Sequence, residues 1–233
     1  MDELKQPRIE LFNGDCLELL TRMEPECIDL LVTDPPYKTI SGGDSGNRPK
    51  GMLSGNRNLF KHQNDIEIDD WMPLVYKVLK EESHAYIFTN ALNLKDMLVE
   101  SEKVGFKLHN LLVWEKNNCT PSQYYMKNCE YVLFLRKGKA KWINDIGGSK
   151  TVHQFNNIIG NKTHPCEKPV DLLKFYIRNS SNEGDLVLDP FMGTGSCGVA
   201  CKETNRNFIG IERDQKYYDI AKRRLEDGTS IVQ

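Results

Sequence analysis

The sequence lacks several features that mark membrane, secreted or metal-binding proteins. No apolar run reaches the ~20 residues that a membrane-spanning helix requires, and Met1 to Lys5 has no apolar core of a signal peptide, so we expect a cytoplasmic protein. The seven cysteines are odd in number and form no Cys-x-x-Cys pair, which argues against a disulfide framework or a zinc site, and we expect no metal. The net charge of −2 gives no overall attraction to a polyanion, so only local basic clusters are informative about such a partner.

Apolar runs with strand character alternate with helical stretches along the 233 residues. This alternation predicts an α/β fold with a mainly parallel sheet and helices on both faces, and the length suits a single domain over residues 1–233. Two polar segments without periodicity, 38–64 and 138–163, are expected as loops. The expected strands are 8–12, 28–33, 85–89, 106–115, 130–136, 185–189 and 207–212, and the expected helices are 15–23, one that Asp69 or Asp70 caps and that ends near residue 80, 92–103 and 170–178.

The most informative motif is Asp34-Pro35-Pro36-Tyr37, which directly follows the apolar run 28–33. Ligands of open α/β sheets bind at the carboxyl ends of strands, which is where Asp34 places a carboxylate. The two prolines fix φ and remove two backbone donors, so nearby carbonyls stay available to a ligand, and Tyr37 offers a flat ring for stacking. These groups suit the exocyclic amine of a nucleobase. The structural alternative is a Pro-Pro turn that closes the strand, with Asp34 as its cap.

A second motif is the glycine-rich turn after the strand that ends at Asp189. It is followed by a helical stretch and by a strand ending in Glu212, an acidic residue placed to accept hydrogen bonds from ribose hydroxyls. The spacing Gly193-x-Gly195-x-x-Gly198 also fits the dinucleotide fingerprint, so by itself it leaves a nicotinamide-dependent oxidoreductase open. No Lys-Ser/Thr follows the glycines, which excludes a P-loop.

Together the two motifs resemble those of the amino-methyltransferases of DNA, S-adenosylmethionine-dependent enzymes that methylate adenine N6 or cytosine N4. The order of the motifs, catalytic before cofactor, is that of the β group of this family. Further similarity lies in Asn13-Gly14-Asp15-Cys16, in His164-Pro165-Cys166-Glu167-Lys168-Pro169, and in the stretch 208–225. The resemblance implies a circularly permuted Rossmann-like sheet of seven strands, mainly parallel, with one antiparallel strand at the edge.

The resemblance also implies roles for individual residues. Asp34, Pro35, Pro36 and Tyr37 would form the catalytic site, with Asp34 and the Pro35 carbonyl accepting the two hydrogens of a flipped-out amine and Tyr37 stacking on the base. Adenine N6 is favoured over cytosine N4 because the motif begins with Asp rather than Ser. The expected cofactor is S-adenosylmethionine, and the residues expected to contact it are Asp15, Cys16, His164, Lys168, Asp189, Phe191, Gly193, Thr194, Gly195, Ser196 and Glu212.

Double-stranded DNA is the expected partner, and the segments 38–64 and 138–163 are the candidate target-recognition regions. Basic residues in and beside them are expected to grip phosphates. Family precedent adds a homodimer and a cognate restriction endonuclease as expected partners. The residues expected to bind DNA are Lys38, Arg48, Lys50, Arg57, Lys61, Lys139 and Lys141.

Three alternatives remain open at this point. The same motif serves enzymes that methylate RNA or a protein amide. A nucleic-acid-binding module that kept the fold without activity would also carry these residues. Cytosine N4 remains the alternative acceptor within DNA.

Overall fold

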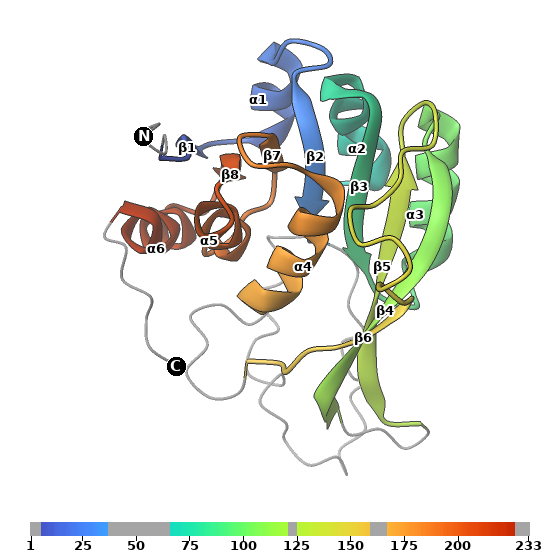
Figure 1. The fold of residues 1–233 in the computed structure, drawn as a ribbon. Helices are drawn as coiled ribbons and strands as arrows, with labels where there is room; N and C mark the ends of the chain where they lie inside the picture. Colours follow the sequence, from blue (N-terminus) through green and yellow to red (C-terminus); the bar gives the residue numbers. More distant parts are fainter. Residues whose placement is uncertain (1–5, 37–65, 121–124, 159–166, 227–233) are drawn as a thin grey trace, which may run out of the picture.

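An eight-stranded sheet in the order β1-β8-β7-β2-β3-β5-β4-β6 forms the centre of the protein (Figure 1). The computed structural model describes residues 6–36, 66–120, 125–158 and 167–226. Only β5 runs antiparallel to its neighbours β3 and β4, and the other pairs are parallel. The strands are β1 (Ile9–Asn13), β2 (Ile28–Thr33), β3 (Leu79–Thr89), β4 (Lys107–Thr120), β5 (Lys127–Arg136), β6 (Val152–Gln154), β7 (Leu186–Asp189) and β8 (Asn207–Glu212).

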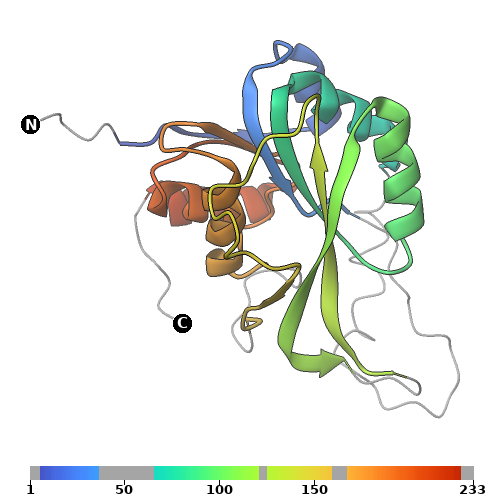
Figure 2. The ribbon, with the colours of Figure 1, turned by 45° about the vertical axis from the view of Figure 1, so that its right-hand side comes forward.

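Helices cover both faces of the sheet (Figures 1 and 2). Three of them pack on one face, namely α4 (Val170–Ser180), α5 (Ser196–Glu203) and α6 (Gln215–Glu226). The opposite face carries α1 (Cys16–Arg22), α2 (Ile68–Val78) and α3 (Leu94–Val104). The middle of strand β2 is a continuous apolar run because both of its faces are covered: Leu30 and Val32 enter the first core, and Leu31 enters the second.

Strands β2 and β7 lie side by side at the centre, with Leu31 paired to Leu188. From β7 the chain continues through α5 to β8 on one side, and from β2 it continues to α2 and β3 on the other. The connections therefore diverge at this pair, which creates a crevice beyond the carboxyl ends of the two strands. This crevice is the place where ligands of open α/β sheets bind.

The predicted α/β fold with a mainly parallel sheet and helices on both faces is confirmed, with three differences in detail. The sheet has eight strands rather than seven, because Val152–Gln154 adds to the open edge of β4 inside a segment expected to be irregular. The antiparallel strand is internal rather than at the edge. Helix α2 starts earlier than expected, since Glu67 is its cap and Asp70 is the third residue of a capping box.

Within the described residues, no helix is long and apolar enough to cross a membrane.

Candidate active site

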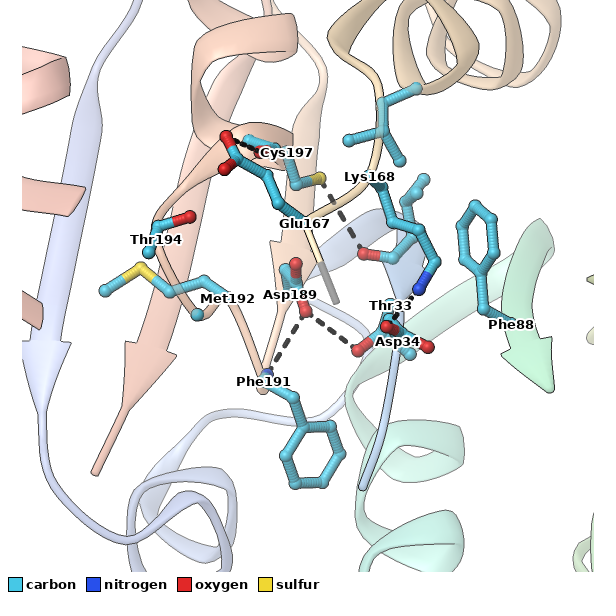
Figure 3. A pocket seen from close by; sticks show the side chains of 14 residues that line it. Thr33, Asp34, Phe88, Glu167, Lys168, Asp189, Phe191, Met192, Thr194 and Cys197 are labelled. Atoms are coloured by element: carbon cyan, nitrogen blue, oxygen red, sulfur yellow. Dashed lines mark hydrogen bonds and ion pairs between the residues drawn. The ribbon is translucent and has the colours of Figure 1, made fainter. Parts of the chain in front are cut away.

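The two sequence motifs meet at the carboxyl ends of β2 and β7, although 156 positions separate the residues that join them (Figure 3). Thr33 is the last residue of β2, and its hydroxyl donates to Asp189 Oδ1 over 2.8 Å. The Phe191 amide donates to the same oxygen over 3.1 Å. Burial raises the pKa of Asp189 to about 7, although both hydrogen bonds favour the ionised form. Thr33 was not among the expected site residues, because a threonine at a strand end carries no distinguishing sequence signal.

A cleft with an empty volume of about 470 Å³ opens at this junction. Its walls include Asp34, Lys168 and Phe88 on one side and Asp189 with the glycine loop on the other. The other residues that line the cleft are Val32, Thr33, Glu167, Leu173, Phe191, Met192, Gly193, Thr194, Ser196 and Cys197.

The glycine loop depends on two positive φ angles, +53° at Gly193 and +83° at Gly195. A Cβ atom at Gly193 would meet nothing within 4 Å, so this position leaves open space beside the cleft. A Cβ atom at Gly195 would lie 3.0 Å from that of Ala221, so this glycine allows α6 to approach the loop closely. One glycine therefore leaves room for a ligand, and the other allows helix packing.

Glu212, at the end of β8, fixes the other side of the loop. Its carboxylate accepts the Gly193 amide over 3.0 Å and the Asp214 amide over 2.8 Å. Burial raises the pKa of Glu212, and these two amides oppose the rise. Because Glu212 already braces the loop, any contact with a ribose would use the remaining acceptor capacity of its oxygens.

Arg224 on α6 binds the glycine loop, although it lies outside the sequence motif that forms this loop. Its guanidinium donates to the Thr194 carbonyl over 2.9 Å and forms an ion pair with Glu167 over 2.8 Å. It also lies 3.2 Å from the Thr194 hydroxyl and 3.4 Å from that of Ser196. Thr194 and Ser196, which the sequence assigned to the cofactor, thus have partners within the protein. No local motif marks Arg224, so sequence reasoning missed it.

Asp34 directly follows β2 and belongs to a chain of side chains that alternate in charge. The Lys168 ammonium forms an ion pair with Asp34 Oδ2 and lies 3.4 Å from Glu130 Oε2, and Lys116 pairs with the other oxygen of Glu130. Burial raises the pKa of Asp34, and Lys168 opposes the rise. For Glu130, the ammoniums of Lys168 and Lys116 outweigh burial and hold its pKa below the ordinary value.

One oxygen of the Asp34 carboxylate remains available to a ligand. Asp34 Oδ1 is buried and has no hydrogen-bond partner among the residues that the structure describes. A buried acceptor without a partner is costly, which points to an external donor. Sequence reasoning missed Glu130 and Lys116, and the only available signal was that these charges interrupt strand segments.

The remaining predicted residues fall into three groups. Asp15 and Cys16 reach the same edge of the sheet, since the Gly14 amide donates to the Glu212 carbonyl over 3.1 Å. The Asp15 carboxylate caps α1 by accepting from the Leu17 amide, and neither Asp15 nor Cys16 lines the cleft. The residues that lie outside the described ranges are Tyr37, Lys38, Arg48, Lys50, Arg57, Lys61 and His164.

Lys139 and Lys141 are not brought to the cleft. They follow β5, whose last residue Arg136 pairs with His84 near the start of the ladder between β3 and β5, at the edge opposite to Asp34. The His84 Nε2 atom donates to the Lys141 carbonyl over 3.1 Å, which ties this segment to that far edge. Lys139 and Lys141 therefore lie at the edge of the sheet opposite to the cleft.

A hairpin arm, formed by residues 115–120 of β4, by residues 125–126 and by residues 127–130 of β5, projects beyond the carboxyl ends of β2 and β3 instead (Figures 1 and 2). The last pair of β3 with β5 is Thr89 with Tyr131, whereas β4 stays paired with β5 as far as Lys127. The arm carries exposed side chains, including Tyr125, which is 94% exposed, and Lys127. Sequence reasoning predicted both strands but not their extension past the sheet.

An α/β sheet that joins an acidic Pro-Pro motif and a glycine loop in one central crevice has the ligand-binding architecture of an open α/β enzyme. Residues 28–223 match the family model described as DNA methylase for N6 and N4 positions, and the chain belongs to this family.

Individual relatives agree with this assignment. The chain is 30% identical to type II methyltransferase M2.DpnII of Streptococcus pneumoniae, over 93% of this chain and 89% of that protein. The crystal structure of the M1.HpyAVI–SAM complex matches with a TM-score of 0.71 at 26% identity, over 93% of this chain and 100% of that one. PvuII DNA methyltransferase, described as cytosine-N4-specific, shares the fold with a TM-score of 0.77 at 20% identity, over 98% of this chain and 89% of that one.

Proposed function

We propose that this chain methylates the exocyclic N6 of an adenine flipped out of double-stranded DNA, with S-adenosylmethionine as methyl donor. Methyl transfer to an amino group of DNA follows from family membership. The observation that supports a role for Asp34 is its buried, unpaired Oδ1 at the wall of the cleft. The choice of adenine rests on the Asp that begins the motif.

The cleft suits the cofactor chemically. The Asp189 carboxylate is the group available for the methionine ammonium, and the open space at Gly193 lets backbone approach the ligand. Phe191 contributes a ring held edge-on by Trp71, with the ring centroids 5.5 Å apart. When bound, S-adenosylmethionine supplies an already activated methyl group, so the protein needs no covalent intermediate.

The task of the protein is to orient the amine. Asp34 Oδ1 and the Pro35 carbonyl would accept the two amino hydrogens, which draws the nitrogen lone pair out of conjugation and aims it into the cleft. The Asp34 carboxylate also stabilises the positive charge that develops on the nitrogen. Tyr37 would stack on the extruded base, which offsets part of the unstacking cost with roughly 1–3 kcal/mol.

We propose that the hairpin arm contacts DNA beside the cleft, together with the segment 38–64. Lys127 supplies a cation for phosphate, and the exposed Tyr125 ring supplies a stacking surface. Lys127→Gln is expected to weaken DNA binding and to reduce the salt slope by about one phosphate contact. Lys139→Gln is the matched control from the opposite edge, and we expect it to leave binding unchanged. An equal effect of both substitutions would contradict the assignment of the DNA face.

The decisive experiment uses cofactor with a labelled methyl group, genomic DNA and the full chain. Digestion and chromatography are expected to yield labelled N6-methyladenine, and Asp34→Ala is expected to abolish the label while cofactor binding persists. N4-methylcytosine alone would replace the proposed base. Label in RNA or protein but not in DNA would overturn the DNA substrate, and no label in any of them would favour an inactive binding module.

We also propose a cognate restriction endonuclease, supported by the type II designation of M2.DpnII. Protection of expressing cells' DNA from a type II nuclease tests this proposal. A homodimer is proposed from family precedent, and sedimentation of the full chain tests it.

A further inference from the structure

The charged chain around Asp34 has a geometry that methyl transfer by itself does not explain. Four side chains alternate in sign, with Lys116 and Glu130 on neighbouring strands, Lys168 just before α4, and Asp34 after β2. Their exposed fractions lie between 7% and 20%, so water screens them little. Two aromatic rings support the cations, with Lys168 Nζ 5.1 Å from the Phe88 centroid and Lys116 Nζ 4.7 Å from that of Trp114.

We propose that Lys168 is the positioning residue for Asp34, and that Glu130 and Lys116 hold its ammonium in place, so that the Asp34 carboxylate stays charged with Oδ1 facing the substrate amine. This inference rests on the proposed methyl transfer. It gives Lys168 a role different from the expected contact with the cofactor carboxylate.

The contacts of the two Asp34 oxygens support these separate roles for Lys168 and the substrate amine. Lys168 binds Oδ2 of Asp34, which leaves the unpaired Oδ1 as the oxygen available to a donor. Of the described residues that line the cleft, Lys168 is the only lysine or arginine, whereas Asp34, Asp189 and Glu167 are acidic. Without this cation, burial and the nearby Glu130 would both favour a protonated Asp34.

The groups that face Asp34 predict opposite effects from two substitutions. Lys168→Met removes the adjacent positive charge, so the pKa of Asp34 rises. Glu130→Gln removes a negative charge that competes for Lys168, so the pKa of Asp34 falls. Lys116 and Asp189 are unchanged in both variants and provide a constant background.

The test is the pH dependence of single-turnover methylation at saturating DNA and cofactor. We expect Lys168→Met to move the acidic limb of the profile upward by about one pH unit or more, the scale of an adjacent charge, with activity recovering as pH rises. Glu130→Gln is expected to move the limb downward. The matched control is Lys174→Met on α4, which removes ion pairs with Asp171 and Glu203 away from the cleft and should not move the limb.

A second measurement does not require activity. Carbon-13 NMR titration of the Asp34 carboxyl in the folded protein should show the same opposite shifts. A pH-independent loss of rate, or shifts in one direction for both variants, would overturn the proposal, as would weaker cofactor binding with an unmoved limb. Absence of methylation by the natural protein would instead refute the proposed function, while the NMR shifts would still report on the coupling to Lys168.

Discussion

Asp189→Asn separates the structural cost of a buried charge from its use in binding. The Asp189 side chain is 6% exposed, and its Oδ1 atom accepts both internal hydrogen bonds, from the Thr33 hydroxyl and the Phe191 amide. An asparagine can present its amide oxygen at the same place. The substitution thus keeps the shape and both acceptor contacts but removes the negative charge.

The magnitude follows from the pKa of Asp189, which burial raises from 3.8 to about 7. The folded state therefore binds this proton more tightly than the unfolded state, so stability falls as pH rises from about 4 to about 7 and is then level. At about 1.4 kcal/mol per pH unit, the charged form costs the folded protein about 4 kcal/mol. Because this shift already includes the two hydrogen bonds that favour the charged form, the neutral asparagine is expected to gain about 4 kcal/mol at pH 8.

Urea denaturation of the ligand-free protein at pH 8 and pH 5.5 measures this gain. Since Asp189 is already protonated in the folded state at pH 5.5, the advantage of Asp189→Asn should be about 2 kcal/mol smaller there. The matched control is Asp171→Asn, whose side chain is 75% exposed and which should show no such pH dependence. Calorimetry should show cofactor affinity about 10- to 100-fold weaker for Asp189→Asn, the value of one charge-assisted hydrogen bond. An advantage that is the same at both pH values would refute the reasoning.

The other predictions concern Arg224 and a buried histidine. Arg224→Met should weaken cofactor binding about 10-fold with little change in kcat, because the Thr194 carbonyl loses its donor. Calorimetry measures the change in affinity, with Arg223→Met as the exposed control. A fall in kcat without weaker cofactor binding would contradict the prediction. Burial lowers the pKa of His84 to about 4, so the folded state loses stability as pH falls from about 6.5 to 4. His84→Gln should therefore reduce the stability lost between pH 7 and pH 5 by about 2 kcal/mol in urea denaturation, and an unchanged loss would show that His84 is not the titrating group.

Local sequence patterns predicted most of the fold. Strand β2 was predicted with its exact bounds, because a run of apolar residues ended by two prolines leaves little choice of structure. The three-residue strand β6 was missed, because it forms only by adding to the open edge of β4 and is too short to show a period. The internal position of β5 was also missed, since strand order depends on pairing between distant segments.

Function was predicted where it depends on motifs that are short in sequence. The Asp34 motif and the glycine loop were found because prolines and glycines constrain the backbone locally, whatever surrounds them. Lys139 and Lys141 were predicted to bind DNA from their charge and their place in the segment 138–163, and the sheet places them at the edge away from the cleft. The charge of a residue does not by itself predict at which edge of the sheet that residue will lie.

The sequence by itself determined the enzyme class, and it marked the glycine loop and the acidic residue that we propose for the cofactor and the amine, because each is encoded by neighbouring residues. Only the tertiary structure decided that Lys168 pairs with Asp34, that Glu130 and Lys116 extend the charged chain, and that Arg224 binds the glycine loop. The physical reason is that charge pairing acts through space, over a few ångströms, between elements far apart along the chain.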